Sequence, residues 1–577
     1  MAAGEIRRRV QKKFKLRGFT LKVEALQEAL SFLSHFPDAE DEALDLLLDE
    51  IDKESLKSSI IDGDAIRRVV SLLLEAEAAV DPTSPVVSNR SALRVIDAFV
   101  VPRFCYDPIK KVFYEYTGRL SIHGEAGDKA ALYRDRYQLL LQRLTRDKYF
   151  SRPIFDSEMA DSESCEITPI QSLIGCTGRR WLVGFISQLE EGHFYLEDLS
   201  AAIPIDLTNA ISLRLKKTDF LDIQYKITSG FFVENTVIVA EGELLSSGTF
   251  KILKKSRLVL AMDDSISSIA VFDVQFEHHW FKFVNTCGFP PLEDRDDSLS
   301  LLMGLDFFGG GVFSTEENLR LSALEKKAVN DMFVVLSDVW LDSEETMEKL
   351  AAVLDGYESV EVVPSLFVLM GNFASRPCNL SFHSFSTLRM QFEKLGELIK
   401  AHPRINEQSR FLFIPGPDDA GPAKVLPTCA LPNYLIEELQ KHIPTAIFSS
   451  NPCRVKFYNQ EIAFFRQDLL YRMRRSSLIP PSSEETTDPF EHLVATITHQ
   501  SHLCPLPLTV QPIIWNYDHC LRLYPTPHTI VLGDRSEQKA FKYTGITCFN
   551  PGSFSSDSTF AAYRPCTREV ELSALES

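Results

Sequence analysis

The sequence lacks the paired cysteine spacing that a disulfide framework or a structural zinc finger requires. Its 11 cysteines are scattered from Cys105 to Cys566, and no two of them form a C-x-x-C pair. Disulfide-rich domains and zinc fingers use clustered, paired cysteines. We therefore expect reduced, mostly buried thiols and a protein of a reducing compartment.

Long apolar runs are also missing. The first residues include Glu5, Arg7, Arg8 and Arg9 where a secretory signal would have an apolar segment. No apolar run approaches the ~20 residues that a membrane-spanning helix needs. The sequence therefore predicts a soluble intracellular protein with no membrane anchor.

Positive charge is scarce relative to negative charge. The chain has 61 Lys and Arg against 80 Asp and Glu, a formal net charge of −19 over 577 residues. Proteins that bind nucleic acid tightly usually carry a strongly basic domain or face. Protein partners are therefore favoured over tight DNA binding, although a local basic patch stays possible. The length predicts two to four domains.

Residues 1–79 have the periodicity of a small helical bundle. Ile6, Val10 and Phe14 recur at every fourth position, and Gly18 follows as a natural helix end. Further apolar stripes predict three more helices, through Leu26, Leu30 and Leu33, through Leu44, Leu47, Leu48 and Ile51, and through Ile66, Val69, Val70 and Leu73. The basic residues of the first helix either contact DNA or form a solvated or protein-binding face, and the second reading is favoured.

Residues 80–164 are predicted to be a linker and a connecting helix. The segment Asp81-Pro82-Thr83-Ser84-Pro85 cannot continue a helix, and a helix is expected over residues 134–146. From residue 165 to 290 the pattern changes to short runs rich in β-branched and aromatic residues, which predict an OB-fold barrel. These runs are 181–186, 193–197, 203–207 and 237–241. Because Phe231 and Phe232 have no interleaved basic residues, a barrel used for protein packing is favoured over one that binds single strands.

Residues 291–329 are predicted to be a junction, a tether or a loop, because they combine Pro291, the acidic run 293–297 and the glycines 309–311. From residue 330 to 577, apolar strands alternate with helical stretches, which predicts an α/β sandwich. Strands are expected at 332–336, 365–370 and 411–414, and helices at 343–354 and 385–401.

The loops after these strands resemble those of the calcineurin-like metallophosphoesterases, but most of the expected metal ligands are replaced. Active members place Asp-x-His, Gly-Asp, Gly-Asn-His-Asp, a lone His and Gly-His-x-His at successive strand ends. This sequence keeps Asp338, but it has no histidine in Arg466-Gln467-Asp468 and has other residues at the remaining ligand positions, namely Trp340, Asn372, Pro417, Asp418, Asp534 and Ser536. A two-metal site depends on ligand type and number, so we expect a vestigial cleft that holds no metal or cofactor. The alternative is a divergent phosphoesterase that uses Asp338, Asp418, Asp419 and Asp534.

Taken as a whole, the chain resembles the B-subunit family of eukaryotic replicative DNA polymerases, in particular its epsilon branch. The segments that carry the resemblance are Phe14-Lys15-Leu16-Arg17-Gly18, Phe307-Phe308-Gly309-Gly310, 336–342, Phe413-Ile414-Pro415-Gly416-Pro417, Asn451-Pro452-Cys453-Arg454, 502–507 and 550–554. The resemblance implies a multidomain α+β protein with a helical bundle, an OB-fold and an inactive calcineurin-like phosphoesterase domain. Residues 211–228 and 250–283 look like insertions relative to that family.

The same resemblance implies an accessory, non-catalytic role in DNA replication in the nucleus. The two larger domains would bind the C-terminal region of the polymerase catalytic subunit. The helical domain would reach the replicative helicase through the GINS complex, and DNA would be reached through the assembled polymerase. His499 and His502 could form a metal clip, but without further ligands a structural or interface pair is favoured.

Overall fold

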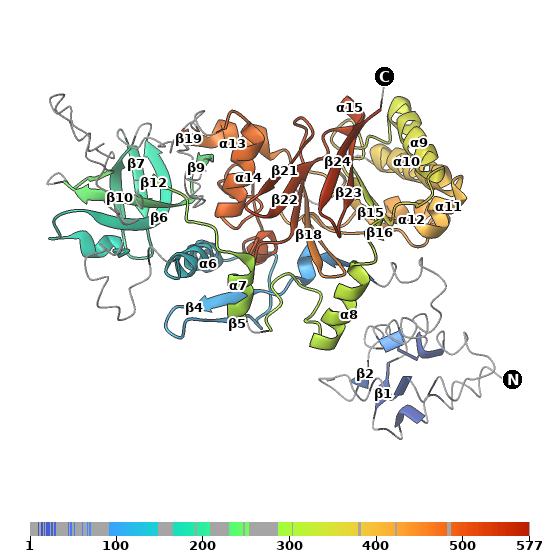
Figure 1. The fold of residues 1–577 in the computed structure, drawn as a ribbon, viewed down its shortest axis with the longest axis horizontal. Helices are drawn as coiled ribbons and strands as arrows, with labels where there is room; N and C mark the ends of the chain where they lie inside the picture. The colour runs from blue at the N-terminus through green and yellow to red at the C-terminus, as the bar shows by residue number, and fades with distance from the viewer. Residues whose placement is uncertain are drawn as a thin grey trace, which may run out of the picture. The chain divides into compact units, whose positions relative to one another are not determined.

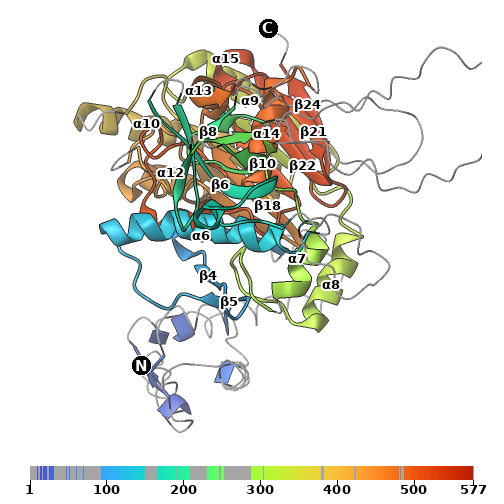
Figure 2. The same ribbon diagram turned by 90° about the vertical axis from the view of Figure 1, so that its left-hand side faces the viewer.

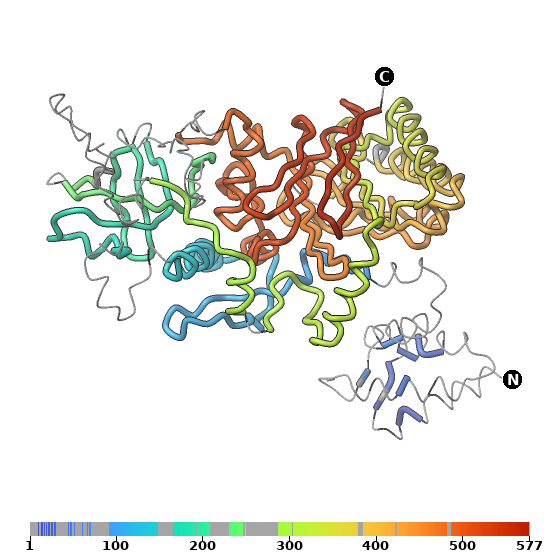
Figure 3. Tube along the Cα trace, in the orientation of Figure 1, coloured from blue at the N-terminus to red at the C-terminus, as the bar shows by residue number. Residues whose placement is uncertain are grey.

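The computed structural model divides the chain into two compact units, residues 1–93 and 94–577. Figures 1 and 3 trace both units. In the first unit, the structure describes residues 10, 13–15, 17, 19–22, 25, 26, 28–30, 44, 47, 48, 51, 60, 61, 66, 69, 70, 92 and 93. In the second, it describes residues 94–147, 150, 166–190, 193–207, 230–245, 248–252, 287–302, 304–378, 382–421, 424–479, 481 and 486–575.

The first unit has one apolar core. Its buried members include Val10, Phe14 and Leu26, which the helical periodicity places on inward faces. Two short parallel strands, β1 (Thr20–Leu21) and β2 (Ile60–Ile61), were not predicted. Ile6, Leu33 and Leu73 lie outside the described residues, as do the arginines at positions 7–9.

The second unit contains a closed β-barrel in which β11 pairs with both β8 and β10. The strands are β6 (Arg180–Glu190), β7 (His193–Glu197), β8 (Ala202–Asp206), β10 (Val237–Leu244), β11 (Phe250–Ile252) and β12 (Cys287–Gly288). Leu182, Ile186 and Ile238 fill its interior. Residues 250–252, the start of the segment expected to be an insertion, form the barrel strand β11. The rest of that segment, and residues 211–228, lie outside the described residues.

The second unit also contains two six-stranded sheets, with strand orders β16-β15-β14-β13-β23-β24 and β21-β22-β20-β18-β17-β3. The strands are β3 (Leu93–Asp97), β13 (Phe333–Ser337), β14 (Leu366–Met370), β15 (Arg410–Ile414), β16 (Ile447–Phe448), β17 (Cys453–Phe457), β18 (Gln460–Arg466), β20 (Thr529–Gly533), β21 (Lys539–Tyr543), β22 (Ile546–Asn550), β23 (Thr559–Arg564) and β24 (Glu569–Ala574). β13, β14 and β15 are parallel, and β18 is parallel to β20. Their central residues are apolar and fully buried, as expected for parallel strands covered on both faces.

Helices cover both sheets (Figure 1). The helices are α9 (Glu344–Glu358), α10 (Phe382–Lys400), α11 (Pro403–Gln408), α12 (Asn433–His442), α13 (Leu469–Ser476), α14 (Pro489–His499) and α15 (Phe554–Asp557). Leu350, Phe392 and Leu435 of α9, α10 and α12 pack on the first sheet. Leu493 and Ile497 of α14 pack on the second sheet. The chain therefore alternates strands and helices from residue 333, as the sequence predicts.

The prediction of a loop-like junction over residues 291–329 is wrong. Two helices form there, α7 (Arg295–Leu302) and α8 (Thr315–Glu325). The side chain of Ser314 caps α8 by accepting a hydrogen bond from the Glu317 amide, and acidic residues in the first turn suit the helix dipole. The preceding region is also more ordered than expected, because β3 joins a sheet and β4 (Phe104–Asp107) pairs with β5 (Val112–Glu115).

Helix α6 (Ala126–Leu144) lies between the barrel and the two-sheet region, and Figure 2 shows it along its length. The buried guanidinium of Arg143 donates to the Ser501 hydroxyl at 2.6 Å and to the His499 carbonyl at 2.7 Å. On the barrel side, the Tyr137 hydroxyl donates to the Val183 carbonyl at 3.2 Å. A buried cation and its acceptors therefore join α6 to the end of α14. No helix in the described part of the chain is both long and apolar enough to span a bilayer.

Candidate functional site

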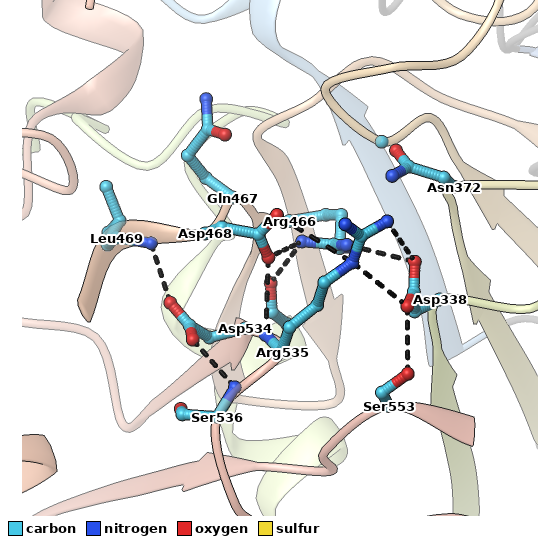
Figure 4. A network of polar contacts seen from close by, with 12 residues as sticks. Asp338, Asn372, Arg466, Gln467, Asp468, Leu469, Asp534, Arg535, Ser536 and Ser553 are labelled. Carbon is cyan, nitrogen blue, oxygen red and sulfur yellow. Dashed lines mark hydrogen bonds and ion pairs between the residues drawn. The ribbon is translucent and has the colours of Figure 1, made fainter. Parts of the chain in front are cut away.

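The loops at the carboxyl ends of five strands converge on one polar cluster. Asp338 follows β13, Asn372 follows β14, and Asp418 lies in the loop after β15. Arg466 ends β18, and Asp534 follows β20. Figure 4 shows Asp338, Arg466 and Asp534 near one another, with Asn372 beside them. Since the carboxyl edge of parallel strands is where α/β folds build sites, this cluster is the candidate functional site.

Asp338 is the centre of the cluster, and its carboxylate is only 1% exposed. Its Oδ1 accepts hydrogen bonds from Trp340 Nε1 at 3.2 Å, Arg466 at 3.3 Å and Arg535 at 3.1 Å. Its Oδ2 accepts from Arg535 Nε at 3.1 Å and Ser553 Oγ at 2.8 Å. A carboxylate offers about four lone-pair positions, and protein donors occupy them in this structure.

Arg466 is completely buried beside Asp338. Besides Asp338, its guanidinium donates to the carbonyl oxygens of Gly371 and Gly533 and to Asp468 Oδ1. It thereby connects the strand ends of both sheets. A buried charge is tolerated only when its donors are used and an opposite charge is near, and Arg466 meets both conditions.

Arg535 places a second guanidinium on the same carboxylate, in a two-pronged contact through Nε and Nη2. Its side chain is 42% exposed, so it covers the cluster from the solvent side. Burial alone would raise the pKa of Asp338, but the charges of Arg466 and Arg535 and their hydrogen bonds hold this pKa below its ordinary value. Asp338 is therefore ionised and neutralised by protein groups.

Asn372 and Asp418 form a separate polar contact. The amide oxygen of Asn372 accepts a hydrogen bond from the Asp418 backbone N–H at 3.0 Å. The carboxylate of Asp418 pairs with Lys424 at 2.5 Å. Pro417, immediately before, is half-buried. Asp418 is thus paired with a cation from its own loop.

Asp419 is held by backbone groups. Its Oδ1 accepts from the Phe373 N–H and its Oδ2 from the Gly416 N–H, both at 2.7 Å. Burial raises the pKa of Asp419 to about 6, although these hydrogen bonds and Arg466 act in the opposite direction. Gly371 makes room for this carboxyl group, since a Cβ there would lie 1.8 Å from Asp419 Oδ2.

Asp534 caps a helix. Its Oδ2 accepts from the N–H groups of Leu469 and Leu470, at 2.6 and 3.0 Å, in the first turn of α13. Its Oδ1 accepts from the Ser536 N–H at 2.9 Å. Helix N-termini stabilise carboxylates in this way, so the geometry gives Asp534 a structural role.

The ionisable side chains of the cluster are carboxylates and guanidinium groups. In the part of the chain that the structure describes, no imidazole bonds to Asp338, Asp418, Asp419, Asp468 or Asp534. Sequence reasoning brought together the correct loops, but it gave no role to Arg466, Arg535 or Ser553. The available signal was an arginine at the end of one strand, Arg466, and another just after a second strand, Arg535. A single sequence does not reveal which carboxylate such arginines would meet.

Two further sets of residues that the sequence singled out have structural partners. His499 binds the Pro290 carbonyl and the Tyr543 hydroxyl, both at 2.9 Å, whereas His502 pairs with Asp518 at 3.2 Å. The rings therefore face different groups, as the structural reading of this pair expects. Phe231 is buried, and Phe232 stacks on Phe289 at 4.5 Å between ring centroids. Phe231 therefore lies inside the protein, and the half-buried Phe232 packs against Phe289.

Comparison with known proteins agrees with this organisation. Three family models match: the N-terminal domain of DNA polymerases epsilon over residues 2–72, the OB-fold domain of DNA polymerase epsilon subunit 2-like proteins over 126–257, and the B subunit of DNA polymerases alpha and epsilon over 333–542. The DNA polymerase epsilon B subunit of Arabidopsis thaliana is 60% identical over 99% of both chains. DNA polymerase epsilon subunit 2 of Homo sapiens is 32% identical over the full length of both chains.

Proposed function

Because the chain belongs to the B-subunit family of DNA polymerase epsilon, we propose that it is a non-catalytic accessory subunit of this polymerase in nuclear DNA replication. The observation that carries the non-catalytic part is the pairing of Asp338 with Arg466 and Arg535. In a two-metal hydrolase this carboxylate would face divalent cations. Here the guanidinium groups supply the positive charge, so the phosphoesterase-like cleft is a structural centre.

The replacement of metals by arginine has a physical consequence for stability. A guanidinium is permanently charged and needs no ion from solution. The cluster therefore holds the ends of β13, β14, β18 and β20 together at any free metal concentration. Trp340, Asn372, Pro417, Asp418, Asp534 and Ser536 act in this proposal as packing, pairing or capping residues.

We assign the partners by domain. The barrel and the two-sheet region, about residues 165–290 and 330–577, bind the C-terminal region of the polymerase catalytic subunit. The helical domain, residues 1–79, links the polymerase to the replicative helicase through the GINS complex. Residues 1–93 form their own compact unit, which supports the proposal that they and the rest of the chain bind different partners.

The two alternatives receive less support. A divergent phosphoesterase would need Asp338 free for a metal, but its lone pairs are taken by protein donors. A single-strand-binding barrel would need exposed aromatics for base stacking, whereas Phe231 is buried and Phe232 packs on Phe289.

Affinity capture from nuclear extract tests the proposal. The full chain and residues 94–577, which form a compact unit, would each be tagged and recovered. Both should retain the large polymerase catalytic subunit, and only the full chain should retain GINS components. Recovery of neither the catalytic subunit nor GINS with the full chain would refute the proposed role.

A further inference from the structure

Helices α10 and α12 bring together three side chains of metal-binding type that take no part in the Asp338 cluster. Glu393 and Glu397 lie one helical turn apart on α10, and His442 is the last residue of α12. One ligand atom from each residue lies within 4.8 Å of the other two. All three side chains are half-buried or exposed, so ions from solution can reach them.

These three side chains differ from their neighbours along the same pair of helices. Arg389 of α10 pairs with Glu437 and Glu438 of α12, and Lys441 also pairs with Glu438. By contrast, Glu393, Glu397 and His442 form no hydrogen bond or ion pair with one another or with any other residue that the structure describes. Two carboxylates one turn apart on a helix repel each other, and a bound cation would relieve that repulsion.

The packing of the two helices fixes the position of the imidazole. A Cβ at Gly396 would lie 3.0 Å from Cδ2 of His442 and 3.2 Å from Cα of Leu439, so the helices touch at this glycine. The ring is thereby held against the face of α10 that carries both glutamates. It also lies at the C-terminus of α12, where the helix dipole favours positive charge.

We propose that Glu393, Glu397 and His442 bind a divalent transition-metal ion, for which zinc is the best match. Zinc takes imidazole nitrogen and carboxylate oxygen at about 2.0–2.2 Å, and a water molecule would complete a tetrahedral set. Magnesium and calcium prefer oxygen ligands alone, so the imidazole selects against them. The side chains would close slightly around the ion.

The ion would act as a clamp between α10 and α12. It would neutralise the two glutamates and add a second connection beside the ion pairs of Arg389 with Glu437 and Glu438. Because a metal and a proton compete for the imidazole, binding should weaken as the pH falls.

Calorimetric titration of the full chain with zinc chloride tests this site. The comparison is between the unaltered protein, the double variant E393Q/E397Q, the single variant His442→Ala, and the control E344Q/E348Q. Glu344 and Glu348 are exposed and lie one turn apart on α9. The control therefore removes the same two negative charges from one helix but leaves Glu393, Glu397 and His442 intact. All four proteins should show the same circular dichroism spectrum.

We expect one saturable zinc-binding event that the control keeps. It should weaken by at least about tenfold in His442→Ala and in E393Q/E397Q, because each loses a direct ligand. Identical isotherms in all four proteins would assign zinc to cysteine thiols or other groups and overturn the proposal. Absence of saturable binding in the unaltered protein, or equal loss in the control, would also overturn it.

Discussion

A guanidinium nitrogen of Arg466 lies 3.3 Å from Oδ1 of Asp338, and neither side chain is more than 1% exposed. The two residues are 128 positions apart: Arg466 ends β18 of one sheet, and Asp338 directly follows β13 of the other. The pair therefore connects the two sheets where their carboxyl ends meet. Loss of either residue would leave a buried charge short of its partner.

Arg466 should contribute far more to stability than Arg535, although both bind Asp338. Arg466→Met leaves a buried carboxylate short of charge, and such losses cost about 3–5 kcal/mol. Arg535 is 42% exposed, so Arg535→Met should cost at most about 1 kcal/mol. Urea unfolding of both variants measures the difference, and equal losses would contradict the central position of Arg466.

Gly371 should tolerate no side chain. A Cβ there would lie 1.8 Å from Asp419 Oδ2 and 2.5 Å from the Gly416 nitrogen, so Gly371→Ala should prevent stable folding. Gly356 of α9 is the matched control, since nothing lies within 4 Å of its added Cβ. Gly356→Ala should stabilise the protein by roughly 0.5–1 kcal/mol through helix propensity. Thermal unfolding distinguishes the two variants, and similar behaviour would show that the loop at Gly371 can move.

Stability should fall as the pH drops from about 6.5 to 4. Burial and then Arg136 lower the pKa of His502 to about 4, so in this window the unfolded chain binds a proton that the folded chain excludes. Burial acts similarly on His519 and His528, whose pKa values fall to about 3. Asp419 acts in the opposite direction, since its raised pKa favours the folded state in acid.

The variant His502→Gln isolates one part of this effect. Between about pH 6.5 and 4, the slope of the unfolding free energy against pH reports how many more protons the unfolded chain binds than the folded chain. The substitution should reduce that number by up to about one. Chemical unfolding at half-unit pH steps measures the slope. An unchanged slope would mean that His502 is protonated in the folded protein.

A fragment of residues 291–577 should not fold by itself, although its sheets are nearly complete. It lacks Arg136 of α6, whose guanidinium contacts the buried carboxylate of Asp518 at 2.5 Å. Arg136 and His502 hold the pKa of Asp518 below its ordinary value against the effect of burial, so removal of Arg136 leaves a buried charge poorly paired.

The matched control is the fragment 94–577, which keeps α6 and nearly all of β3. It should elute as a compact monomer with a cooperative unfolding transition, whereas residues 291–577 should aggregate or unfold without cooperativity. A cooperative transition in the shorter fragment would show that α6 is dispensable.

Many regular elements of the second unit could be predicted from local pattern, because mainly apolar runs such as 365–370 and 411–414 identify buried strands. The expected strand at 193–197 is β7 to the residue. The helices α7 and α8 were missed, because their glycine- and proline-rich surroundings indicate loops. Their helical signals, such as the cap at Ser314, are short.

For the Asp338 cluster, the positions of the loop residues could be predicted from the sequence, but their partners could not. The positions of Asp338, Asn372 and Asp534 follow from strand ends, since parallel strands place their carboxyl ends at one edge. The partners of these residues did not follow, because contacts such as Arg466 with Asp338 join distant parts of the chain. Residue spacing predicts which side chains share a face of one helix or strand. It does not predict which buried charged residues from different elements form ion pairs.

Manganese binding followed by electron paramagnetic resonance tests the central claim most directly, with the unaltered protein compared with Asp338→Asn. Because protein donors occupy the lone pairs of Asp338, we expect Asp338→Asn to leave the number of bound manganese ions unchanged. Two ions per chain that disappear in Asp338→Asn, together with loss of phosphodiester hydrolysis, would contradict a cleft held together by arginine.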